Sequence, residues 1–125
     1  MSSLQHITLS LNANPSLARL VRMTASNVAM LCSMSVERVE DARMAAEEAF
    51  IYACTSDPSG ELDMDFAFDS DRVQIVCELV DATFADATDD DPTSAYAELI
   101  LGSVCDEFSK REDNRALVLE LKADV

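Results

Sequence analysis

Alternation of apolar and polar residues predicts four β-strands along the chain. Residues 7–11 alternate in this way and indicate a first strand with one buried face. The clearest alternation spans residues 62–68. A second run at residues 73–79 follows it after a tight connection at residues 69–72, so the two strands are expected to form an antiparallel hairpin. The last strand is predicted at residues 117–121.

Apolar residues that recur every three or four positions predict three helices between these strands. The first opens with Asn14 and Pro15, an N-cap and first-turn pair, and Ser35 caps the second. The third opens at Pro92 and carries apolar residues as far as Phe108. The expected apolar stripes are Leu17, Leu20, Val21, Thr24 and Val28 on the first helix, and Val39, Ala42, Ala46, Ala49, Phe50 and Ala53 on the second. The resulting order is β-α-α-β-β-α-β.

Length and composition favour a single domain over residues 1–125, because nearly half of the residues are apolar and can form one core. No apolar run is as long as a membrane span, and the first residues lack the pattern of a secretory signal. We therefore expect a cytoplasmic protein. Four cysteines stand singly and are interpreted as small core residues of a reducing compartment, with no metal site: Cys32, Cys54, Cys77 and Cys105.

The net charge of −15 is concentrated in the middle of the chain. Between Asp57 and Glu98 there are thirteen acidic residues and one basic residue, Arg72. Such a field repels nucleic acid and anionic membrane surfaces, so neither is an expected partner. Two interpretations stay open: the acidity attracts a basic protein partner, or it only keeps a small protein soluble.

Two adjacent carboxylates, Glu47 and Glu48, lie within the apolar pattern of the second helix. Glu48 precedes Ala49 and falls near the edge of the buried stripe. A carboxylate in this position is either an ordinary solvated residue or a general base that points into a cleft.

The order of elements, the chain length and the run EDARMAAEEAFIYA at residues 40–53 resemble those of the bacterial anti-sigma-factor serine/threonine kinases. These kinases belong to the GHKL superfamily of histidine kinase-like ATPases, and the resemblance covers nearly the whole chain. The resemblance implies a fold of the α/β class and of the GHKL type. Its helices and strands are expected to form two layers, an arrangement known as an α+β two-layer sandwich. In that fold, helices cover one face of a mainly antiparallel sheet.

The second helix of this family carries a Glu-Ala-x-x-Asn-Ala motif. The resemblance places the family's catalytic glutamate on Glu48 and its magnesium-binding asparagine on Tyr52. The glutamate is kept and the asparagine is lost. A tyrosine has no amide oxygen and cannot replace a hard oxygen ligand in the same geometry.

The family's first glycine box holds the adenine and lets the backbone approach the nucleotide. An ungapped comparison places its positions on Leu79, Asp81 and Thr83. A shift of two residues brings Asp81 onto the adenine position, and Thr83 and Ala85 then replace the glycines.

The second glycine box, at the start of the last helix, falls on Ala95 and Ala97. The chain has only Gly60 and Gly102, and neither stands where it could cradle phosphate groups. The nucleotide site is therefore expected to be degraded, without ATP or magnesium as a cofactor.

The acidic segment at residues 79–92 corresponds to the family's ATP lid, and its carboxylates would repel a triphosphate. Within it, Asp86, Thr88 and Asp90 have the one-three-five spacing of a calcium loop. Asp91 follows where such a loop needs glycine, and the twelfth position is Ala97 instead of glutamate. This departure favours a solvated loop.

Three functions remain as hypotheses. The leading one is a degenerate anti-sigma regulator that binds a sigma factor or an anti-anti-sigma factor without phosphorylating it. The second is an active kinase of the same family with divergent motifs. The third is a homodimer or scaffold that retains only the fold.

Overall fold

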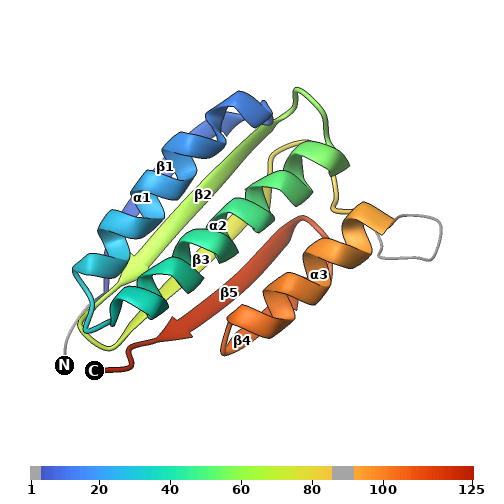
Figure 1. Cartoon of the computed structure of the whole chain (residues 1–125). Coiled ribbons are helices and arrows are strands. Elements are labelled where there is room, and N and C mark those ends of the chain that lie inside the picture. The colour runs from blue at the N-terminus through green and yellow to red at the C-terminus, as the bar shows by residue number, and fades with distance from the viewer. Residues whose placement is uncertain (1–3, 86–91) are drawn as a thin grey trace.

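The computed structural model describes residues 4–85 and 92–125, and in this part of the chain it holds a five-stranded open sheet with three α-helices over one face (Figure 1). The sheet order is β1-β2-β3-β5-β4, and each neighbouring pair is antiparallel. The expected α+β class and antiparallel sheet are thus confirmed. The elements are β1 (Gln5–Asn12), a 3-10 turn η1 (Pro15–Leu17), α1 (Ala18–Met30), α2 (Val36–Ser56), β2 (Glu61–Phe68), β3 (Arg72–Leu79), α3 (Pro92–Val104), β4 (Glu107–Lys110) and β5 (Ala116–Lys122).

The predicted order β-α-α-β-β-α-β was wrong because it omitted strand β4. Phe108, which was assigned to the third helix, lies on β4 and pairs with Leu119 of β5. Strand β4 has only four residues, and a segment this short shows no clear alternation. Asn114 adopts a left-handed conformation, with φ of 57°, in the connection to β5. Asparagine tolerates this conformation better than most residues.

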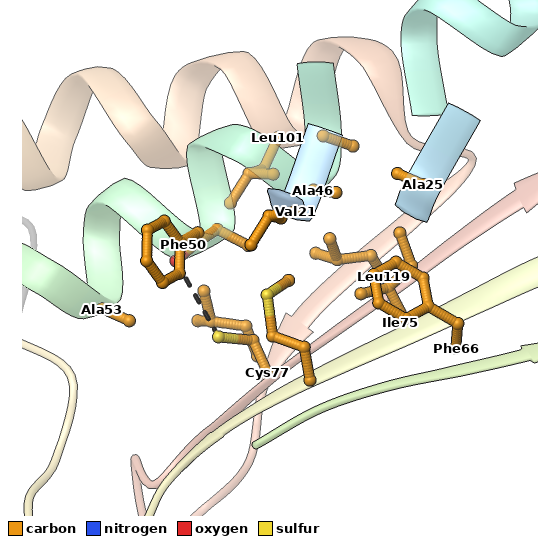
Figure 2. Close-up of a cluster of buried hydrophobic side chains, with 14 of the residues drawn as sticks. Val21, Ala25, Ala46, Phe50, Ala53, Phe66, Ile75, Cys77, Leu101 and Leu119 are labelled. Atoms are coloured by element: carbon orange, nitrogen blue, oxygen red, sulfur yellow. Dashed lines mark hydrogen bonds between the residues drawn. The ribbon is translucent and has the colours of Figure 1, made fainter. Parts of the chain in front are cut away.

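The core lies between the helices and the inner face of the sheet. The register aligns Phe66, Ile75 and Leu119 across three strands, and all three side chains are buried. Figure 2 shows these residues below Phe50 of α2 and Val21 of α1. Alternation therefore predicted correctly which face of β2, β3 and β5 is buried.

Helix α2 lies in the middle of the helical layer, between α1 and α3 (Figure 1). Its side toward the sheet and the neighbouring helices is lined mainly by buried alanines: Ala42, Ala45, Ala46, Ala49 and Ala53. Small side chains let the three helix backbones approach one another closely. Among the described residues, no helix has both the length and the apolar character that a membrane crossing requires.

The buried stripe of α1 differs from the predicted one. Val21 and Val28 are buried as expected, but Leu20 is 47% exposed and Thr24 is only partly buried. Two small residues, Ala25 and Ala29, complete the stripe instead. The pattern rule favoured the larger side chain at position 20, whereas close packing against α2 selects alanine.

We predict that Phe50→Ala lowers the free energy of unfolding by about 3–5 kcal/mol, because it leaves a cavity between α2 and the sheet. Leu99→Ala on the exposed side of α3 is the matched control and should change stability by less than about 0.5 kcal/mol. Urea denaturation followed by circular dichroism measures both. Equal losses in the two variants would contradict the assignment of Phe50 to the core.

Candidate functional site

Tyr52, the position at which the resemblance expects a magnesium ligand, is fully buried on α2. Its hydroxyl group lies 2.7 Å from the Glu98 carboxylate of α3, to which it donates, and also lies against the carbonyl oxygen of Ala85. The Phe84 ring packs edge-on against the Tyr52 ring, with 5.0 Å between ring centroids. The phenol is therefore enclosed by residues 84–85 and by helix α3.

Lys110 of β4 completes this group of residues. Its ammonium nitrogen lies 3.0 Å from the Glu98 carboxylate and 3.0 Å from the carbonyl oxygen of Ala85. It also lies 5.4 Å from the centroid of the Tyr52 ring, within the range of a cation–π contact. We call Tyr52, Phe84, Ala85, Glu98 and Lys110 the Tyr52 cluster.

The electrostatics of the Tyr52 cluster keep the phenol neutral and the lysine charged. Burial raises the pKa of Tyr52 to about 12. Burial alone lowers the pKa of Lys110, but its hydrogen bonds with Tyr52 and Glu98 raise that pKa on balance. Neither group can act as a base near neutral pH. The cluster joins α2 to the 84–85 segment, α3 and β4.

Glu48 lies one helical turn before Tyr52 on α2 and is half-buried. Burial, and next the neighbouring Glu47, raise the pKa of the Glu48 carboxyl group. Glu47 itself forms an ion pair with Arg22 of α1. Within the described residues, the structure shows no hydrogen bond or ion pair for the Glu48 side chain.

The remaining predicted site residues are not gathered around one cavity. Leu79 is fully buried in β3, and Ala97 is buried on α3, whereas Ala95 is exposed. Asp81 and Thr83 line a surface hollow of about 330 Å³ together with Val80, Ala82 and Arg115. Neither Glu48 nor Tyr52 lines this hollow. The structure thus places Glu48 and Tyr52 one turn apart on α2, and the segment that follows Thr83 contacts Tyr52 through Phe84 and Ala85.

Among the described residues, no three His, Cys, Asp or Glu side chains are placed so that they could hold a metal ion. The calcium-like spacing at Asp86, Thr88 and Asp90, and the neighbouring Asp91, lie outside the described residues. Three of the cysteines are buried as expected for core residues, and Cys105 is partly buried.

The sequence interpretation missed Glu98 and Lys110. Glu98 lies one turn from Ser94 and Leu101, which are buried on the same side of α3, so a carboxylate near this stripe was a usable signal. Lys110 could not be found, because strand β4 was not predicted. A buried tyrosine also requires a partner for its hydroxyl group, and this requirement pointed to an unidentified polar neighbour.

Comparison with known proteins adds no family assignment. A scan against models of protein families found no match, and a search of curated proteins found none either. The resemblance described above therefore rests on the residues quoted for it, and function has to be argued from the geometry of the chain.

We predict that Tyr52→Phe lowers the free energy of unfolding by about 1–3 kcal/mol, because Glu98 and Lys110 lose a buried hydrogen-bond partner. Tyr96→Phe on the exposed side of α3 is the control and should be close to neutral. Urea denaturation at pH 7 measures both variants. Similar effects of the two substitutions would show that the hydroxyl group of Tyr52 is not specifically important.

Wild type and the Tyr52→Phe variant also allow a test of the pH dependence of stability. The pKa of Tyr52 is raised to about 12, whereas an unfolded tyrosine ionises near pH 10. The stability from the neutral phenol is therefore complete below about pH 10 and is lost as the pH rises from about 10 through 12. Across this window, wild type should lose more stability than Tyr52→Phe. A parallel decline in the two proteins would contradict the raised pKa.

Proposed function

We propose that this chain is a protein-binding regulator of the anti-sigma type, with a GHKL-type fold that has lost ATP and magnesium binding. In this proposal it acts in the cytoplasm and binds a sigma factor or an anti-anti-sigma factor as a folded module. It does not transfer phosphate to that partner.

The Tyr52 cluster is the observation that carries the proposal. Mg²⁺ requires near-octahedral oxygen ligands and usually retains several waters. At the position of the expected ligand there is instead a neutral phenol, already engaged with Glu98 and fully buried. The Lys110 ammonium group stands beside it and would repel a divalent cation.

The packing around Tyr52 supports the same conclusion. Phe84 is almost fully buried against the Tyr52 ring, and the backbone amide of Ala85 donates to the Ser56 hydroxyl group at 3.1 Å. The 84–85 segment is thereby held over the end of α2. Leu79 and Ala97 contribute side chains to the core, where a nucleotide-binding box would need glycines and open backbone.

The charge of the chain indicates the class of partner. A net charge of −15 opposes binding to phosphate backbones and to anionic lipids. A basic surface on a protein is the electrostatic complement. The free cysteines in the described residues fit a reducing compartment, which supports a cytoplasmic location.

One observation favours the active kinase as a second candidate. Glu48 is half-buried with a raised pKa, and perturbed carboxyl groups of this kind often serve as general bases. In an active kinase, the segments that enclose the Tyr52 phenol would have to move apart. Two experiments separate the candidates.

The first prediction from this proposal is that magnesium-ATP does not bind with useful affinity. Isothermal titration calorimetry should give no saturable heat at micromolar ATP, and 1 mM magnesium-ATP should not raise the melting temperature. A titration of magnesium chloride alone controls for ion effects. A micromolar dissociation constant, equivalent to roughly 8 kcal/mol of binding free energy, would sink the proposal.

The second prediction is that Glu48→Gln leaves partner binding unchanged and leaves stability within about 1 kcal/mol of wild type. The sign of any change should be stabilising at neutral pH, because the raised pKa shows that the charged form is disfavoured in the folded protein. Radiolabelled ATP and a candidate partner give the functional readout. Phosphorylation of a partner serine by wild type that Glu48→Gln abolishes would instead establish the active kinase.

A further inference from the structure

Exposed apolar side chains gather at the end of the molecule where α1 turns into α2. Among the large hydrophobic residues described, the five most exposed are Leu99 of α3 and four residues at this end. Those four are 66–82% exposed: Met30, Leu31, Val36 and Val125. Burial of such groups on binding is favourable, and clusters of them mark interaction sites.

A hollow of about 370 Å³ lies within this apolar region. It is lined by Met30, Met34, Val36, Val39 and Glu40. We call Met30, Leu31, Met34, Val36 and Val39 the tip surface. Unbranched methionine side chains adapt to different partner shapes, and the two methionines of the tip surface give the hollow this property.

Carboxylates surround the tip surface on several sides. The turn between β2 and β3 approaches it, because the amide of Ser33 donates to the carbonyl oxygen of Ser70 at 3.0 Å. Asp69 and Asp71 flank Ser70 in this turn, and Asp124 accepts hydrogen bonds from Ser35 on the other side of Ser33. Together with two glutamates of α2, the rim consists of Glu37, Glu40, Asp69, Asp71 and Asp124.

Two arginines near the rim already have acidic partners, one of them within the rim itself. Arg38 is directed inward, where it donates to the carbonyl oxygens of Lys122 and Val104 and pairs with Asp106. Arg43 pairs with Glu40. Asp124 accepts hydrogen bonds from the backbone and hydroxyl group of Ser35, and these lower its pKa, so it remains charged. The rim therefore presents net negative charge around an apolar hollow.

We propose that the tip surface binds an amphipathic helix whose apolar face enters the hollow and whose lysines and arginines meet the acidic rim. An adaptable methionine-lined groove is a suitable receptor for apolar anchors at three- and four-residue spacing. A second copy of this chain is disfavoured as the occupant, because tip-to-tip contact would place two acidic rims against each other. The proposal rests on the protein-binding role proposed above and assigns the partner's chemistry.

The test uses a fluorescent synthetic peptide of about 18 residues, roughly 27 Å as a helix, with leucines on one face and lysines on the other. Fluorescence anisotropy with the full chain should show saturable binding. Met30→Ser combined with Val36→Ser should weaken it about tenfold, as expected for loss of central apolar anchors. Tyr96→Ser combined with Leu99→Ser removes comparably exposed apolar groups from α3 and should have no effect.

The charge of the rim is tested separately. Glu37→Gln combined with Asp71→Asn should weaken binding about threefold at 0.1 M salt and have little effect near 1 M, where the screening length falls to about 3 Å. Glu61→Gln combined with Glu112→Gln is the control, because both glutamates are exposed and lie at the end of the sheet opposite the β2–β3 turn.

Four results would overturn the proposal. The first is no saturable binding up to about 1 mM peptide, and the second is equal affinity for a peptide with glutamates in place of the lysines. The third is an equal loss of peptide affinity in the Met30/Val36 variant and in the Tyr96/Leu99 variant. The fourth is a wild-type dimer in sedimentation that the Met30/Val36 variant dissociates. None of these measurements contains nucleotide. A negative peptide-binding result therefore does not change the result of the ATP titration. Conversely, a chain that binds ATP and also binds the peptide through the tip surface would overturn only the proposed loss of the nucleotide site.

Discussion

The close packing of α2 is the constraint on which the rest of the structure depends. This helix lies over the middle of the sheet and touches both other helices, so its side chains must be small on three sides. Alanines meet that need along most of its length, and Phe50 supplies bulk where the sheet leaves room. The positions of α1 and α3, and with them every surface discussed above, follow from how near these helices can approach α2.

Tyr52 is the second large buried side chain of α2, and unlike Phe50 it carries a polar group that determines the arrangement at the C-terminal end of the helix. A buried hydroxyl group without a partner would cost about 1–3 kcal/mol, so the fold has to bring an acceptor to it. Glu98 is that acceptor, and its own charge is then balanced by Lys110. One polar group in the core thus specifies the placement of α3 and β4. A closed network of this kind stabilises one arrangement, whereas a nucleotide site needs an opening.

The sequence predicted the fold where the physical signal was repeated many times. Strands β2 and β3 alternate over seven or eight residues, and a one-residue error in register would expose every core side chain, so the pattern was unambiguous. Strand β4 was missed because four residues carry too little periodicity. The stripe on α1 was partly wrong because hydrophobicity does not distinguish Leu20, which faces outward, from Ala25, which the contact with α2 requires. The partners of Tyr52 could not be named, since they come from segments 46 and 58 residues further along the chain and meet it only through tertiary packing.

The two ends of α2 carry different properties, and their separation bears on how the proposed regulator would work. Val36 begins the helix at the tip surface, and Tyr52 lies sixteen residues later, which corresponds to about 24 Å along the helix axis at 1.5 Å per residue. That distance exceeds the screening length of about 10 Å in 0.1 M salt, so charges at one end have little direct effect at the other. The C-terminal end can then be closed by the Tyr52 cluster while the N-terminal end keeps an exposed, charged surface. The proposed loss of nucleotide binding and the proposed binding of a partner are physically independent in this fold, because the residues assigned to each share a helix without sharing contacts.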